Sequence, residues 1–138
     1  MNNILLVDDN KYIIEALAMT LGQYVKDCAV LRAKNGREAV DILKSVPVDL
    51  VLTDINMPVM NGYDLIAYRN DRHPALPLVA MTADPAPGVL KRLRALGISE
   101  CLEKPFDFDS VSRLLLDKLP PRRYAPTTAM TEALSATA

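Results

Sequence analysis

The sequence predicts a doubly wound α/β domain in which a five-stranded parallel sheet carries helices on both faces. Short, continuous apolar runs that end in charged or polar residues recur along the chain, and such runs are typical of strands buried on both faces. Apolar residues at helical spacing lie between these runs. Alternating strands and helices joined by right-handed crossovers produce a parallel sheet that is covered on each side.

Five apolar runs are predicted to be strands. In chain order they are 4–7, 29–33, 49–53, 78–81 and 100–103. The fifth run is the weakest, because Glu100 and Glu103 flank its only two central residues. We expect the strand order 2-1-3-4-5, in which the first and third strands are neighbours.

Each run is followed by a segment with an apolar helical face. Gly97 suits the position just after the fourth helix, and Asp107 or Asp109 is expected to cap the fifth. The fourth helix follows the stretch 84–88, which contains two prolines. We therefore expect an Asp84 cap with Pro85 in the first turn, a later helix start, or an irregular loop. The apolar positions are Ile13, Ile14, Leu17 and Leu21; Ala39, Ile42 and Leu43; Leu65, Ile66 and Tyr68; Leu90, Leu93 and Leu96; and Val111, Leu114 and Leu115.

Composition excludes several classes of protein. The chain has 138 residues, which is the size of one domain. Its formal net charge of −1 argues against direct binding to nucleic acid or to an anionic membrane. No apolar run approaches the ~20 residues of a membrane span, so no membrane insertion is expected. The N-terminus lacks the basic region of a signal peptide. A cytoplasmic protein with free Cys28 and Cys101 is expected, and the single histidine, His73, is expected in an exposed loop.

The organisation changes after Leu119. Residues 120–126 are rich in proline and cannot continue a helix, and residues 127–138 are small, polar and rich in alanine. We therefore expect a domain over 1–119 and a C-terminal tail, or a truncated linker, over 120–138. This segment is too short for an effector domain, and Met1 directly before the first strand is typical of a natural N-terminus.

Chemically active residues follow four of the predicted strands. Because parallel strands end at the same edge of the sheet, these side chains are expected to converge. Three carboxylates at one edge repel one another, and a hard divalent cation such as Mg²⁺ would neutralise them. For Asp9 alone, helix capping is the better interpretation, but the joint pattern indicates a site. The residues are Asp8 and Asp9, Asp54, Thr82, and Lys104 with Pro105.

The motifs at these strand ends resemble those of the receiver domain of two-component response regulators. The similarity covers about residues 3–119 and extends to the single-domain chemotaxis regulator, which has a flavodoxin-like fold. The motifs are Leu-Leu-Val-Asp8-Asp9-Asn10, Asp54-Ile-Asn-Met-Pro58-Val-Met-Asn-Gly62, Met-Thr82-Ala83 and Glu-Lys104-Pro105-Phe106.

The resemblance implies a role for each matching residue. Asp54 would accept a phosphoryl group from a phosphohistidine on a sensor histidine kinase or a histidine phosphotransfer protein. Mg²⁺, with Mn²⁺ as an alternative, would be held by Asp8, Asp9, Asp54 and the backbone carbonyl of Asn56. Thr82 and Lys104 would contact the phosphoryl oxygens. Gly62 and Pro105 would be structural, and the bond before Pro105 is expected to be a cis peptide.

Two departures from the family pattern affect the expected switch. Cys101 stands where receiver domains that switch through an aromatic rotamer carry Tyr or Phe. A thiol is too small to replace the ring. Cys101 is expected to be a small apolar filler, which is the preferred interpretation, or an accessible thiol if its strand lies at the edge of the sheet. The second departure is the stretch that begins with Asp84. The helix after it carries Lys91, Arg92 and Arg94 without an acid, and this cationic partner face would prefer an acidic partner.

The leading hypothesis is a phosphorylation-controlled switch that acts through protein–protein contacts in a two-component phosphorelay. Such a protein phosphorylates and dephosphorylates itself without being a turnover enzyme. A phosphatase of the haloacid dehalogenase type is the enzyme alternative, but it needs a second acid where this chain has Asn56. A phosphate-independent binding module is the third hypothesis. The sequence names neither the kinase nor the downstream protein.

Overall fold

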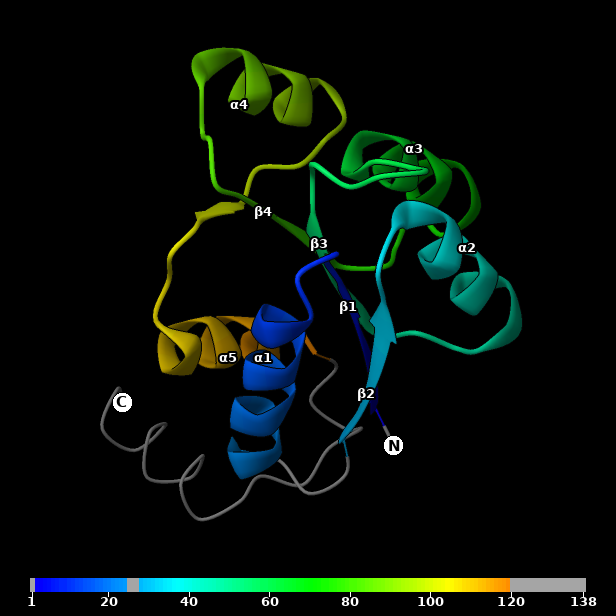
Figure 1. Ribbon diagram of the computed structural model, residues 1–138. Helices are drawn as coiled ribbons and strands as arrows, with labels where there is room; N and C mark the ends of the chain where they lie inside the picture. The colour runs from blue at the N-terminus through cyan, green and yellow to red at the C-terminus, as the bar shows by residue number, and fades with distance from the viewer. Residues whose placement is uncertain (1, 25–27, 120–138) are drawn as a thin grey trace.

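The computed structural model, which describes residues 2–24 and 28–119, is a five-stranded parallel sheet with helices on both faces (Figure 1). The strand order is β2-β1-β3-β4-β5, so the predicted fold class and order are confirmed. The predicted tail over 120–138 lies outside the described residues. The elements are β1 (Asn2–Val7), α1 (Lys11–Tyr24), β2 (Cys28–Ala33), α2 (Gly36–Ser45), β3 (Leu50–Asp54), α3 (Gly62–Arg72), β4 (Leu78–Thr82), α4 (Pro87–Ala95), β5 (Cys101–Glu103) and α5 (Phe108–Asp117).

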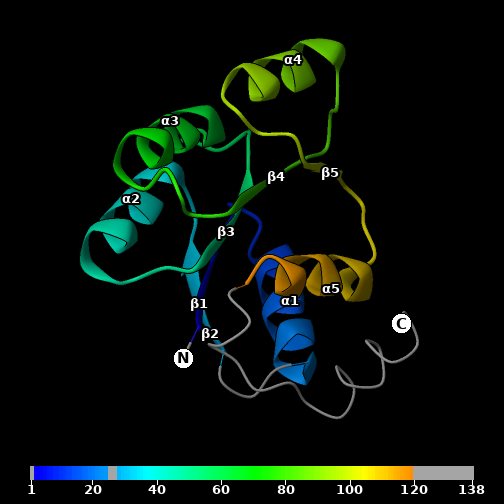
Figure 2. The same cartoon turned by 180° about the vertical axis from the view of Figure 1, so that it is seen from behind.

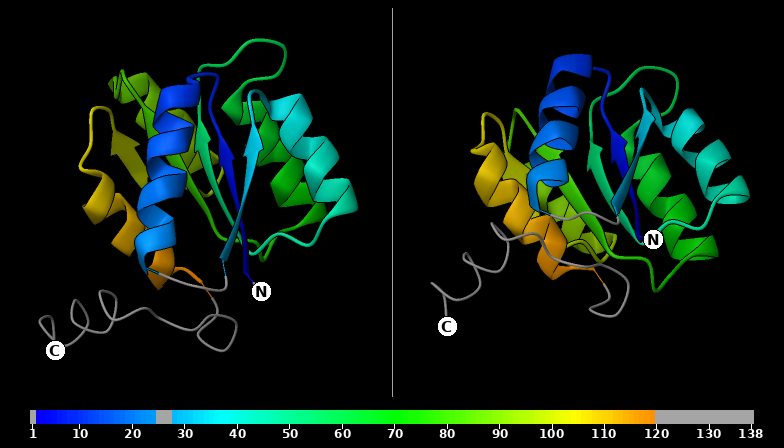
Figure 3. Two further views of the ribbon diagram at one scale, coloured as in Figure 1. Left: turned by 60° about the horizontal axis from the view of Figure 1, so that its bottom comes forward. Right: turned by 90° about the horizontal axis from the view of Figure 1, so that it is seen from below.

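The helices divide into two layers, one on each face of the sheet (Figures 2 and 3). Alternate residues of β1 serve the two layers: Ile4 and Leu6 pack with α1 and α5, whereas Leu5 and Val7 pack with α2, α3 and α4. All four side chains are fully buried. The strand is apolar at successive positions because each face of the sheet is covered.

Asparagine and aspartate side chains determine where three helices begin. Asn35 accepts a hydrogen bond from the Glu38 amide at 2.9 Å, and Asn61 accepts one from the Asp64 amide at 3.0 Å. Asp107 caps α5 by accepting a hydrogen bond from the Ser110 amide. Of the two caps expected from the sequence, Asp107 and Asp109, the first is therefore the one observed. Each of these contacts satisfies an amide that has no partner inside its helix.

The start of α4 follows the later of the expected starts. The helix begins at Pro87 after Ala86, which makes no side-chain cap, so of the three alternatives the late start is observed and the Asp84 cap is not. Proline is compatible with the first helical position because its missing amide would have had no partner there. Gly97 has a φ of 83° just beyond the helix, which confirms its predicted place.

All five strands run toward the same edge of the sheet, where their arrowheads lie in Figure 3. The pairing of Asp54 with Met81 places the end of β3 beside the end of β4. His73 lies in the loop directly after α3, as expected, but it is half-buried rather than exposed, with its ring 5.9 Å from that of Tyr68. None of the helices in the described part of the chain has the length and apolar character needed to cross a bilayer.

Candidate functional site

Three carboxylates meet at the edge where β1 and β3 end. Asp8 and Asp9 follow β1, and Asp54 is the last residue of β3. One oxygen of each carboxylate lies within 4.8 Å of the corresponding oxygens of the other two. Asp8 and Asp54 are buried, whereas Asp9 is exposed. The structure therefore brings together the three acids that the sequence predicted to converge.

Lys104 bridges the two buried acids. Its Nζ lies 2.7 Å from Asp8 Oδ2 and 3.2 Å from Asp54 Oδ2, and its side chain is 14% exposed. Burial by itself would lower the pKa of Lys104, but its hydrogen bonds and charge interactions with the two carboxylates outweigh burial and raise that pKa. The side chain is therefore an ammonium ion at neutral pH. The bond between Lys104 and Pro105 is cis, as predicted.

Backbone amides occupy the remaining oxygen of each buried acid. Asn10 donates its amide to Asp8 Oδ1 at 2.9 Å, and Ile55 donates its amide to Asp54 Oδ1 at 2.8 Å. These bonds fix the orientation of both carboxylates before any ligand arrives. The donor set, which has buried oriented oxygens and one exposed carboxylate, suits a hard cation that keeps some of its waters. A cavity of about 330 Å³ adjoins Asp8 and Asp9, and Asn56 lies exposed just beyond Asp54.

Thr82 lies at the end of β4 and is fully buried. Its hydroxyl donates to the carbonyl oxygen of Asp84 at 3.3 Å and accepts from the Asp84 amide at 3.1 Å. Both contacts are internal to the segment that leads into α4. The hydroxyl therefore holds the path of this segment, and reorienting it would release both contacts.

Two glycines allow the loop between β3 and α3 to pack closely. The Gly62 amide donates to the Ile55 carbonyl at 2.8 Å, and a Cβ at Gly62 would lie 2.4 Å from the Asp54 carbonyl oxygen. The Gly36 amide donates to the Met60 carbonyl at 2.8 Å, where a Cβ would lie 2.7 Å from that oxygen. Gly62 was predicted to be structural, but the role of Gly36 was missed because a glycine at a helix start has an ordinary explanation.

Between these two contacts, the same loop contains an uncommon backbone conformation. Val59 has a φ of 69°, and the Met60 amide donates to the Pro58 carbonyl at 2.8 Å. A β-branched residue rarely adopts this left-handed conformation, which is strained. The loop that leaves Asp54 is therefore held by its surroundings in a conformation that its own residues do not favour.

Comparison with known proteins identifies the family. The family model for the response regulator receiver domain matches residues 4–115. The chain belongs to the response regulator receiver domain family. The response regulator protein PilR of Pseudomonas aeruginosa is 35% identical over 115 residues, which cover 83% of this chain and 25% of the relative. The sensor histidine kinase RcsC of Escherichia coli is 33% identical over 112 residues, which cover 81% of this chain and 12% of the relative. This receiver domain thus spans a quarter or less of these curated relatives.

Solved structures agree with this assignment. The chemotaxis response regulator CheY4 of Vibrio cholerae has a TM-score of 0.76 and 27% identity, covering 86% of this chain and 99% of that one. The response regulator TrrA of Thermotoga maritima, solved in complex with Mg²⁺ and BeF, has a TM-score of 0.74 and 28% identity, covering 86% and 100%. The receiver domain has the fold of these regulators and is a component of two-component systems.

The residues expected on the partner face of the receiver domain differ in their surroundings. Lys91, Arg92 and Arg94 are exposed on α4, and the Arg92 guanidinium also lies over the Tyr63 ring, 3.9 Å from its centroid. This contact was not predicted, since no local sequence pattern links the two residues. Cys101 is half-buried and packs against the second core cluster, and burial raises its pKa. Both features match the preferred interpretation of Cys101 as a filler, although its strand, β5, lies at the edge of the sheet.

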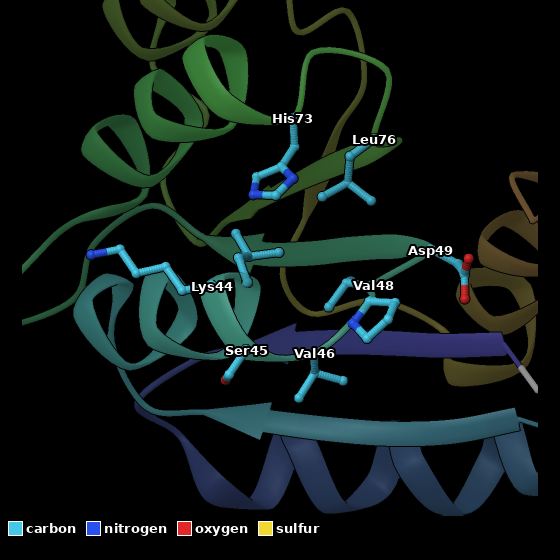
Figure 4. Close-up of a pocket in the computed structure, with 9 residues that line it drawn as sticks. Lys44, Ser45, Val46, Val48, Asp49, His73 and Leu76 are labelled. Atoms are coloured by element: carbon cyan, nitrogen blue, oxygen red, sulfur yellow. The ribbon is translucent and has the colours of Figure 1, made fainter.

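A further cavity of about 420 Å³ lies at the other end of the sheet, between the loops that precede β3 and β4 (Figure 4). Figure 4 shows His73 and Leu76 pointing toward the space above the end of α2. Asp49 borders this cavity, and its Oδ2 accepts the amide of Asn3 at 2.8 Å. Within the described residues, the carboxylate triad lies at the opposite edge, so this cavity does not share the chemistry of the site.

Proposed function

We propose that this receiver domain accepts a phosphoryl group on Asp54 from a phosphohistidine of a sensor histidine kinase or a histidine phosphotransfer protein. One observation carries the proposal: Lys104 bridges two oriented, buried carboxylates beside an exposed third one. A carboxylate oxygen of Asp54 attacks phosphorus, and the P–N bond breaks with its electron pair left on the imidazole. The product is an aspartyl phosphate.

The residues around Asp54 match what this transfer needs. Mg²⁺ held by Asp8, Asp9, Asp54 and the carbonyl of Asn56 would neutralise charge on the transferred group, and Mn²⁺ would serve as an alternative. Lys104 keeps its ammonium near Asp54 and pairs with a phosphoryl oxygen after transfer. The Thr82 hydroxyl leaves Asp84 and donates to another phosphoryl oxygen.

The phosphorylated state is expected to be short-lived. Asn56 and Asp84 are both exposed and polar, so neither covers the phosphorus against attack by water. The domain would then reset without an added phosphatase and would act as a switch rather than as a turnover enzyme. We place the reaction in the cytoplasm because both cysteines are free thiols, as is usual in a reducing compartment. An acidic protein would be the downstream partner of α4.

Intact mass after incubation with acetyl phosphate and Mg²⁺ tests the proposal. We expect one added phosphoryl group in the wild type and none in Asp54→Asn. Asp41→Asn is the matched control, because it makes the same change at an exposed position of α2 and should be labelled normally. Labelling of Asp54→Asn would refute the assignment of the acceptor. Lack of labelling in the wild type, with acetyl phosphate kept in excess so that a short-lived adduct is replenished, would refute the function.

A further inference from the structure

The contact between Tyr63 and Arg92 joins the two helices that follow β3 and β4. The Arg92 guanidinium carbon lies 3.9 Å from the centroid of the Tyr63 ring, well within the range of cation–π attraction. Tyr63 is half-buried against the core cluster shared by α2, α3 and α4. Packing therefore fixes the position of the Tyr63 ring, whereas the exposed Arg92 side chain can move together with α4.

Tyr63 is tied through the backbone to the acceptor. Gly62, its immediate neighbour, donates its amide to the Ile55 carbonyl at 2.8 Å. Ile55 in turn donates its amide to Asp54 Oδ1 at 2.8 Å. The first turn of α3 thus follows the position of the Asp54 backbone without an intervening flexible side chain.

By contrast, α4 is held loosely. Leu93 is the one fully buried residue among those described in this helix, Val89 packs half-buried against the same core cluster, and Ala86 gives the first turn no side-chain cap. Figure 1 shows α4 at the margin of the molecule, and Figure 2 shows the same from behind. The segment before the helix is held by the two hydrogen bonds between Thr82 and Asp84. Few contacts of this kind make a segment easy to move.

We propose that the stack of Tyr63 and Arg92 is a pivot that converts the state of Asp54 into a movement of α4. The proposal rests on the proposed function, because the movement begins when the Thr82 hydroxyl leaves Asp84 for a phosphoryl oxygen. The start of α4 is then released, while the stack keeps the middle of the helix against α3. The helix turns about Arg92 and moves its first turn.

Cys101 favours such a pivot over an aromatic switch. The aromatic ring that reports the state of the threonine in relatives with a rotamer switch is absent from this position, and the thiol is half-buried as a filler. The movement must therefore be directed by contacts of α4 itself. Arg92 supplies one, through Tyr63 in the first turn of α3.

Residue-resolved hydrogen exchange on the full chain, with and without Mg²⁺ and beryllofluoride, tests the pivot. In the wild type, we expect beryllofluoride to change exchange over residues 84–90 and to leave residues 91–96 nearly unchanged. Tyr63→Leu removes the π face but keeps an apolar side chain. In this variant without beryllofluoride, the amides of residues 91–96 should exchange about two- to fivefold faster than in the wild type, because one exposed cation–π contact is lost. Adding beryllofluoride should then change exchange over residues 91–96 as well as over residues 84–90.

Two control variants distinguish loss of the stack from loss of any other group at Tyr63 or of any other cation on α4. Tyr63→Phe keeps the aromatic face and should behave like the wild type. Arg94→Gln removes another exposed cation of α4 and should also leave residues 91–96 unchanged. A urea midpoint for each variant shows that its fold is retained.

Three results would overturn the pivot: wild-type exchange over 91–96 that changes as much as over 84–90, a Tyr63→Leu variant that matches the wild type at rest, or an equal effect of Arg94→Gln. The comparison of Tyr63→Leu with the wild type in the absence of beryllofluoride tests whether the stack holds α4 in place. This comparison does not depend on phosphorylation. Absence of acetyl phosphate labelling would instead refute the proposed function, and with it the switch.

Discussion

Replacing Asp9 by Asn should stabilise the metal-free domain, although it removes a residue of the site. The carboxylates of Asp8, Asp9 and Asp54 lie within 4.8 Å of one another, and Lys104 contacts only the two buried ones among them. At such a distance, two unit charges repel by about 1 kcal/mol when water screens them. Because Asp9 is exposed to water, this screened repulsion applies to it. We therefore expect the free energy of unfolding of Asp9→Asn to exceed that of the wild type by about 1 kcal/mol.

Mg²⁺ should reverse this order. A ligand at ten times its dissociation constant stabilises the folded state by about 1.4 kcal/mol, and the wild type should gain this amount. Asp9→Asn should gain much less, because it has lost the exposed carboxylate. The wild type then becomes the more stable of the two.

Urea unfolding followed by far-ultraviolet circular dichroism measures both quantities. The denaturant slope should stay the same in both proteins, and added NaCl should shrink the difference measured in EDTA. Asp41→Asn, at an exposed position of α2, is the control and should change neither quantity. A less stable Asp9→Asn in EDTA, or equal stabilisation of both proteins by Mg²⁺, would refute the reasoning.

Two further predictions follow from close packing and from burial. Gly62→Ala should destabilise the domain by about 1–3 kcal/mol, because its Cβ would meet the Asp54 carbonyl oxygen at 2.4 Å; Gly22→Ala in α1, where a Cβ meets nothing within 4 Å, should be neutral or stabilising in the same urea titration. Burial, with a smaller contribution from Asp49, raises the pKa of Cys28 to about 11. Alkylation of Cys28 by iodoacetamide at pH 8 should therefore be about a hundredfold slower than that of a cysteine thiol fully exposed to water, and its rate should keep rising until about pH 11. A Cys28 rate that levels off near pH 9 would contradict this.

The architecture could be predicted because the hydrophobic pattern specifies it at every element. The strand containing Leu5 and Leu6 is apolar at successive positions, and a short run of this kind is typical of a sheet buried on both faces. Convergence of Asp8 and Asp54 then follows from the strand order alone. These inferences depend on local pattern and topology, which the sequence carries directly.

Contacts between distant side chains could not be predicted in this way. Lys104 lies closer to Asp8 than to Asp54, a detail that depends on the path of the short loop after β5. The stack of Arg92 on Tyr63 depends on the rotation of α4 about its axis, which one buried leucine and an uncapped start do not specify. The half-buried position of His73 depends likewise on its packing against Tyr68.

The close approaches of Gly36 and Gly62 have a consequence for how this domain can vary. Main-chain contacts at Gly36 and Gly62, together with the buried side chain of Ile55, hold the loop over residues 55–61 in place. The exposed side chains of Asn56 and Asp84 are therefore free to be exchanged without altering the backbone beneath them. Under the proposed function, the glycines would preserve where Asp54 lies, while substitutions at the two exposed positions would set how long the phosphorylated state lasts.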